Sequence, residues 1–110
     1  MIEVFATMVF TLLCLEIRDT QGTDHYIRAL AVALSLYFAV NLSVELTGAA
    51  LNPTIGLVQN VFLAIYDLHE VKSWKQIMIH SLSPLLGGLL AAPLFMLVQK
   101  ARLAMDVNRV

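Results

Sequence analysis

Charged residues are scarce in this 110-residue sequence. They make up 14% of the chain and leave a formal net charge of −1, whereas a soluble domain carries about 25% charged residues. No run of like charges is present, which argues against a surface for nucleic acid. The single cysteine, Cys14, excludes an internal disulfide, and its apolar neighbours favour an inert thiol over a reactive one.

The residue patterns of enzymes are also missing. No group of His, Cys, Asp and Glu residues has metal-ligand spacing, no glycine-rich loop could cradle a phosphate, and no nucleophile lies in a recognisable turn. We therefore expect neither enzymatic activity nor a metal or other cofactor. His80 has no second titratable residue one turn away, so a hydrogen bond between helices is favoured over a proton relay.

Long apolar segments dominate what remains. Hydrophobic residues make up 59% of the chain, and the mean hydropathy is +0.78. Residues 29–51 hold one formal charge, Glu45, and residues 77–98 hold none, so both reach the roughly 20 apolar residues that a membrane crossing needs. Residues 4–15 lie between two glutamates and form a shorter third segment.

A fourth apolar segment, residues 53–66, is too short to cross a membrane, because its helix would be only about 21 Å long. Asn52 is a good helix cap, and Pro53 suits a first helical turn, where its missing N–H is not needed. The small residues 48–50 let the chain dip into a membrane, and Gly56 allows close packing. The free N–H groups of such a helix start would orient water and repel cations, which is typical of a channel.

The sequence thus predicts an all-α membrane protein with a single domain, residues 1–110. We expect transmembrane helices at residues 2–17, 29–51 and 76–99, and a re-entrant half-helix at residues 53–66. Lys and Arg prefer the cytoplasmic side of a membrane. This topology separates these residues five to two, with Arg18, Arg28, Lys100, Arg102 and Arg109 opposite Lys72 and Lys75. We therefore expect a cytoplasmic C-terminus and, since the outer N-terminus has no export signal, a further segment upstream of Met1.

Three stretches resemble, in the right order, the C-terminal half of the aquaporin and aquaglyceroporin family, the major intrinsic proteins, over residues 2–98. IEVFATMVFTLLCL is similar to the fourth transmembrane helix of that family. RALAVALSLYFAVNLSVELTGAALNPTIGL is similar to the fifth helix with the second Asn-Pro-Ala box, and SPLLGGLLAAPLF to the sixth helix. The resemblance implies half of an inverted-repeat channel fold.

The resemblance also implies roles for individual residues. Asn52 would be the hydrogen-bond donor at the pore centre, and Pro53 and Thr54 would complete the box, with Thr54 in place of the usual alanine. Glu3 would lie buried behind the re-entrant loop and accept backbone N–H groups from it. The alternative for Glu3 is a place among the lipid headgroups.

The family's selectivity filter is changed in this sequence. Ile55 stands where the family usually has an arginine, and counting back from the box places Val40 and Ala49 at two further filter positions. All three are apolar, so neutral solutes such as glycerol, urea or peroxide are candidates beside water. Elsewhere, four small residues spaced along the third predicted span indicate close helix packing: Gly87, Gly88, Ala91 and Ala92.

Three hypotheses for function remain open. The first is an aquaporin-like channel for water or small neutral solutes. This chain would be its C-terminal half, and the complete channel would be a homotetramer. The second is a non-conducting three-span protein that pairs with full-length channels in a structural or regulatory role. The third is a homodimeric pore whose two copies are inserted in opposite orientations. In all three the partners are the lipid bilayer and a missing N-terminal half, a full-length homologue or a second copy.

Overall fold

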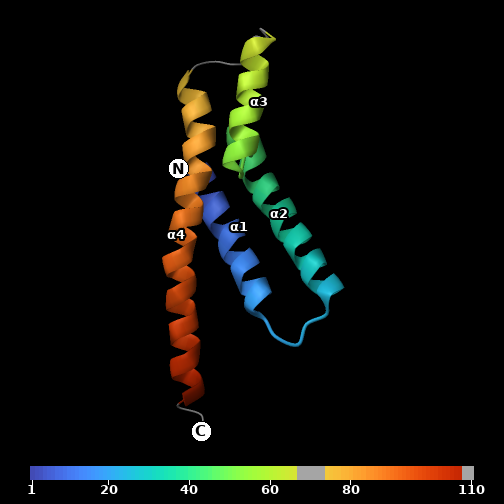
Figure 1. Ribbon diagram of the computed structural model, residues 1–110, viewed down its shortest axis with the longest axis vertical. Helices are drawn as coiled ribbons and strands as arrows, with labels where there is room; N and C mark the ends of the chain where they lie inside the picture. The colour runs from blue at the N-terminus through green and yellow to red at the C-terminus, as the bar shows by residue number, and fades with distance from the viewer. Residues whose placement is uncertain (67–73, 108–110) are drawn as a thin grey trace.

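Four α-helices make up the part of the chain that the structure, a computed structural model, describes: residues 1–66 and 74–107 (Figure 1). They are α1 (Ile2–Asp19), α2 (His25–Thr47), α3 (Pro53–Ile65) and α4 (Trp74–Val107). No strand occurs within these residues. The chain is elongated, 64 × 27 × 20 Å, and α4 runs along its longest dimension (Figure 1). The fold is therefore all-helical, as the sequence predicted.

The helix bounds differ from the predicted spans for local reasons. The Asp24 side chain accepts the Tyr26 N–H at 2.9 Å, so α2 begins at His25 rather than at residue 29. Gly48 takes a left-handed φ of 88° and ends α2 at Thr47, four residues before the predicted limit. The helix thus begins and ends four residues before the approximate bounds predicted for the second span.

The last helix extends beyond its predicted span. α4 begins at Trp74 and continues to Val107, because the residues that follow position 99 are good helix formers with no breaker among them. Its two internal prolines, Pro84 and Pro93, do not end it. At the other boundary, α3 ends at Ile65, and Tyr66 is its C-cap rather than its last residue.

Three helix ends meet beside the first half of α4: the start of α1, the end of α2 and the start of α3 (Figure 1). α1 packs against both α2 and α4, whereas α3 packs against α4 alone among the described helices. From this meeting point α1 and α2 run toward one end of the molecule and α3 toward the other (Figure 1). A short helix that starts at mid-height is the arrangement expected of a re-entrant segment.

Close packing between α1 and α4 depends on two small residues. A Cβ at Gly87 would lie 2.5 Å from the carbonyl oxygen of Val4, and Ala91, one turn later, is fully buried. Gly88 and Ala92, for which the same close packing was predicted, contact no other helix among the described residues, so their role stays a prediction. A Cβ at Gly88 would meet nothing within 4 Å, and Ala92 is exposed, because neighbouring helical residues point about 100° apart.

Most large apolar side chains lie on the outside. The buried apolar cluster consists of three residues only, Ala6, Ala39 and Leu51, among the described residues. A soluble protein buries such side chains, so this exposure indicates that lipid or further protein covers them. α2 and α4 are each long and apolar enough to cross a membrane.

One of the basic residues used for the predicted topology, Arg102, lies where α1 and α4 finish. Arg102 pairs with Glu16, and the Gln99 amide donates to Asp19 at 2.9 Å beside it. The linker at residues 67–73, with Lys72, and the terminal residues 108–110, with Arg109, lie outside the described residues.

Candidate functional site

The connection between α2 and α3 has an unusual backbone. Gly48, Ala49 and Leu51 all have positive φ values, 88°, 55° and 48° respectively. Glycine adopts this conformation readily, but for the other two residues it costs about 1–3 kcal/mol each. Such a loop persists only when its surroundings hold it in place.

Glu3 is the residue that holds the loop. Its carboxylate accepts the backbone N–H of Ala50 and the backbone N–H of Leu51, both at 3.1 Å, and the hydroxyl of Thr47 donates to the same carboxylate. The Thr47 hydroxyl in turn accepts the N–H of Ala49 at 3.4 Å. Only 1% of the Glu3 surface is exposed, so the alternative position among lipid headgroups is wrong. A buried carboxylate is tolerated here because donors surround it.

Asn52 lies where the loop becomes α3. Its side-chain oxygen accepts the N–H of Thr54 at 2.9 Å, and its backbone oxygen accepts the N–H of Gly56 at 3.0 Å, while Pro53 occupies the first turn. Because the oxygen of the amide is used in the cap, the amide nitrogen is left as a donor for another partner. The Asn52 side chain is exposed and so can reach one.

The other residues expected near the pore have different surroundings. Thr54 and Ile55 are exposed on the first turn of α3, with 55% of the Ile55 surface accessible. Ala49 is half-buried in the loop. Val40 is also half-buried and packs against the cluster of Ala6, Ala39 and Leu51. The three predicted filter positions, Val40, Ala49 and Ile55, thus carry aliphatic side chains.

A polar contact joins α3 to α4 further along the half-helix. The side-chain nitrogen of Asn60 lies 3.2 Å from Nδ1 of His80 and also donates to the carbonyl oxygen of Gly56 at 2.6 Å. The sequence predicted a hydrogen bond between helices for His80 but did not identify Asn60 as the partner. The signal was available, because Gly56 and Asn60 are four residues apart and share one face of a helix.

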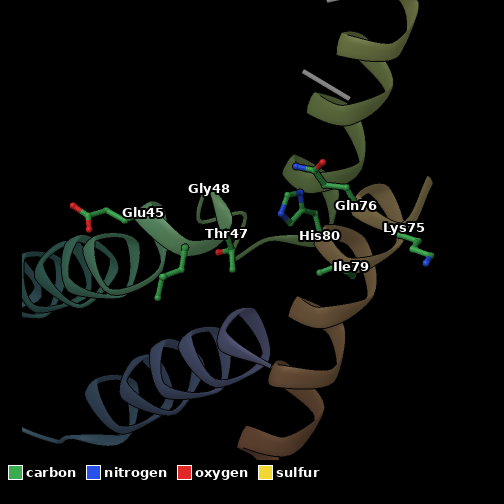
Figure 2. Close-up of a pocket in the computed structure, with 8 residues that line it drawn as sticks. Glu45, Thr47, Gly48, Lys75, Gln76, Ile79 and His80 are labelled. Carbon is green, nitrogen blue, oxygen red and sulfur yellow. The ribbon is translucent and has the colours of Figure 1, made fainter. Parts of the chain in front are cut away.

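Two cavities open beside this contact. The larger, about 520 Å³, lies between the end of α2 and the start of α4 (Figure 2). In Figure 2, Thr47 and Gly48 stand across from Gln76 and His80, while the side chain of Glu45 points away. The smaller, about 190 Å³, is lined by α3 as well, through Gln59 and Asn60 among others. Amide, hydroxyl and imidazole groups line both cavities, and Glu45 and Lys75 also line the larger one.

These features define a class of membrane protein: helical, with a strained loop braced by a buried carboxylate and a capped half-helix that starts beside the first half of a longer helix. The family described as Major intrinsic protein matches residues 1–95. The chain belongs to this family, whose members are integral membrane channels and not enzymes. No curated protein and no solved structure matches the chain.

Proposed function

We propose that this chain forms the C-terminal half of a channel for passive transport of water or small neutral solutes such as glycerol. The observation that carries the proposal is the cap at Asn52. Its amide oxygen is held by the Thr54 N–H at 2.9 Å, so the amide hydrogens are left for a passing molecule. Water and alcohols offer an oxygen acceptor to such a donor.

The helix start favours neutral molecules over cations. The N-terminus of a helix carries about half a positive charge, and among the described residues α3 contains no acidic side chain to offset it. A proton or metal ion would be repelled at this point, whereas a neutral solute would only exchange hydrogen bonds. The site therefore supports passive movement of uncharged molecules.

The apolar filter residues support a solute larger than water. Ile55, Val40 and Ala49 offer no fixed donor and no positive charge, so a solute with carbon atoms can slide past without losing strong interactions. Glycerol fits this chemistry, because its hydroxyl groups can bind Asn52 while its carbon side faces the aliphatic residues. We propose glycerol-like solutes as the substrate class.

The chain supplies one half-helix, and the opposed half-helix of an inverted repeat must come from other residues. We propose that the N-terminal half belongs to the same longer polypeptide or to a separate chain, that the complete channel is a homotetramer in the bilayer, and that the C-terminus is cytoplasmic. An immunoblot of native membranes distinguishes the two sources. A band well above 12.2 kDa means one polypeptide, and a band near that mass means two.

The functional test uses the protein purified from membranes with its other half, reconstituted into vesicles for stopped-flow measurement. We expect water and glycerol permeability above that of empty vesicles. Asn52→Asp should lower both by about tenfold, because aspartate keeps the helix cap and removes the donor. Circular dichroism checks that the variant is folded. If the unaltered protein conducts neither solute, a non-conducting role in which it pairs with full-length channels takes the place of this proposal.

A further inference from the structure

The contact between Asn60 and His80 is the polar link between α3 and the helix that supports it. Among the described helices α3 packs against α4 alone, and the two backbones approach closely at Gly56. A Cβ at Gly56 would lie 2.8 Å from the carbonyl carbon of His80. Asn60 is 6% exposed, so its amide depends on protein partners rather than on bulk water. A change at His80 is therefore transmitted directly to α3.

The hydrogen bonds select one tautomer of the neutral imidazole. The Asn60 nitrogen carries two hydrogens, one for the Gly56 carbonyl oxygen at 2.6 Å and one for Nδ1 of His80 at 3.2 Å. Turning the amide over would set two oxygens against each other at the shorter of these distances. Nδ1 must therefore be the acceptor, and the ring proton must be on Nε2.

We propose that His80 is a positioning residue: it holds α3, and through α3 the donor at Asn52, only while its imidazole is neutral. Protonation puts a hydrogen on Nδ1 and turns the contact into two opposed donors. The ring then swings into the adjoining cavity, because turning the Asn60 amide over to offer its oxygen would set that oxygen against the Gly56 carbonyl oxygen, and α3 loosens from α4. Acid conditions then close or narrow the channel. This proposal rests on the proposed channel function.

The charged groups described near His80 would not hold a protonated ring in its present position. α3 contributes no titratable side chain. Glu45 of α2 and Lys75 of α4 line the larger cavity with His80, but Glu45 is exposed and points away (Figure 2). The carboxylate of Glu3 on α1 is occupied by the loop. Among the described residues no carboxylate is hydrogen-bonded to His80, so the imidazolium gains no partner that would preserve the contact.

The first test is a pH profile of glycerol permeability in vesicles that hold the complete channel. Histidine side chains change charge between about pH 8 and pH 5. We expect glycerol permeability to fall by about tenfold across that interval, because one hydrogen bond is lost and two donors then face each other. His80→Gln offers an acceptor oxygen that does not titrate, so its profile should be flat. His25→Gln is the matched control at the exposed start of α2, and it should leave the fall unchanged.

The second test does not depend on transport. Nitrogen-15 NMR of histidine-labelled protein in detergent should show His80 at pH 8 with Nδ1 unprotonated and Nε2 protonated, and Asn60→Ala should abolish that preference. The proposal is overturned if Nδ1 carries the proton, or if His80→Gln keeps the acid fall. A protein that conducts at no pH but has the expected tautomer contradicts the proposed function instead, so the two failures are distinguishable.

Discussion

The carboxylate of Glu3 accepts the backbone N–H of Leu51 at 3.1 Å, across a separation of 48 residues in the sequence. The same carboxylate accepts the N–H of Ala50, so one side chain of α1 holds two consecutive peptide groups of the loop. Bonds from N–H groups to a buried charge are stronger than bonds between neutral groups. They offset the cost of the left-handed backbone at Ala49 and Leu51 and keep the start of α3 in place.

Replacing Glu3 with glutamine should destabilise the protein by about 2–4 kcal/mol, because the amide puts a donor where the carboxylate accepted one. Thermal unfolding in detergent, followed by circular dichroism, measures the change. Glu45→Gln is the matched control, since Glu45 is exposed on α2, and it should shift stability by less than about 0.5 kcal/mol. Equal losses for both variants would contradict the assigned role of Glu3.

Thr47→Val tests the hydroxyl that connects the loop to Glu3. Valine has nearly the same shape, so packing is retained while the bond to the carboxylate and the acceptor for the Ala49 N–H are lost. We expect a loss of about 1–3 kcal/mol in the free energy of unfolding. Thr54→Val is the comparison, because Thr54 is exposed. Urea or thermal melts with no difference between the two variants would speak against the bridge.

Gly87→Ala should separate α1 from α4, since the added methyl group would lie 2.5 Å from the Val4 carbonyl oxygen. Overpacking of this kind costs about 1–3 kcal/mol. Gly88→Ala adds the same methyl group where nothing lies within 4 Å. It should be neutral or stabilising by up to about 1 kcal/mol, because alanine is the better helix former. The melting temperature of Gly87→Ala should therefore lie below that of the unaltered protein, and that of Gly88→Ala should be equal to it or higher.

Ile55→Arg places a positive, hydrogen-bonding side chain on the first turn of α3, where Ile55 is 55% exposed and leaves room for it. The longer side chain narrows the path, so glycerol permeability should fall by about tenfold, equivalent to about 1.4 kcal/mol in the barrier. Water permeability should fall less. Stopped-flow traces with glycerol and with sucrose gradients give the ratio. A parallel fall for both solutes would argue that Ile55 does not select between them.

Arg102→Gln removes the ion pair with Glu16 at the far end of α1. Both side chains are partly exposed to solvent, so the pair should contribute less than about 1 kcal/mol. The same melt in high salt should reduce even this difference between the variant and the unaltered protein. A large, salt-insensitive loss would mean that the pair has a structural role beyond its charge.

Composition and apolar segments predicted the helical class, and the Asn52–Pro53 pair predicted where the half-helix begins. The ends of the helices were harder to predict from the sequence. They depend on single backbone conformations, such as that of Gly48, which a hydrophobic pattern does not encode. Which of the small residues of α4 face α1 could not be predicted for a related reason. Spacing alone cannot say which of two adjacent small residues faces a neighbouring helix.

The polar contacts of the site could be predicted only in part. A buried carboxylate needs hydrogen-bond donors, so the sequence predicts that Glu3 has partners. Its three donors come from residues 44 to 48 positions away, which the local sequence does not indicate. The pairing of Asn60 with His80 depends equally on how α3 packs against α4, which is a property of the three-dimensional arrangement. Such contacts cannot be predicted from the local periodicity of the sequence.

The hydrogen bonds from the loop to Glu3 also orient the peptide groups on the opposite side of the loop. A trans peptide unit is planar, with its oxygen directed away from its hydrogen, and no described peptide bond is cis. Holding the hydrogens of Ala50 and Leu51 therefore turns the oxygens of the preceding residues, Ala49 and Ala50, away from the carboxylate. One acidic side chain thus polarises the loop: its N–H groups face the carboxylate, and its oxygens face the other side, where the Ala50 oxygen accepts the N–H of Asn52.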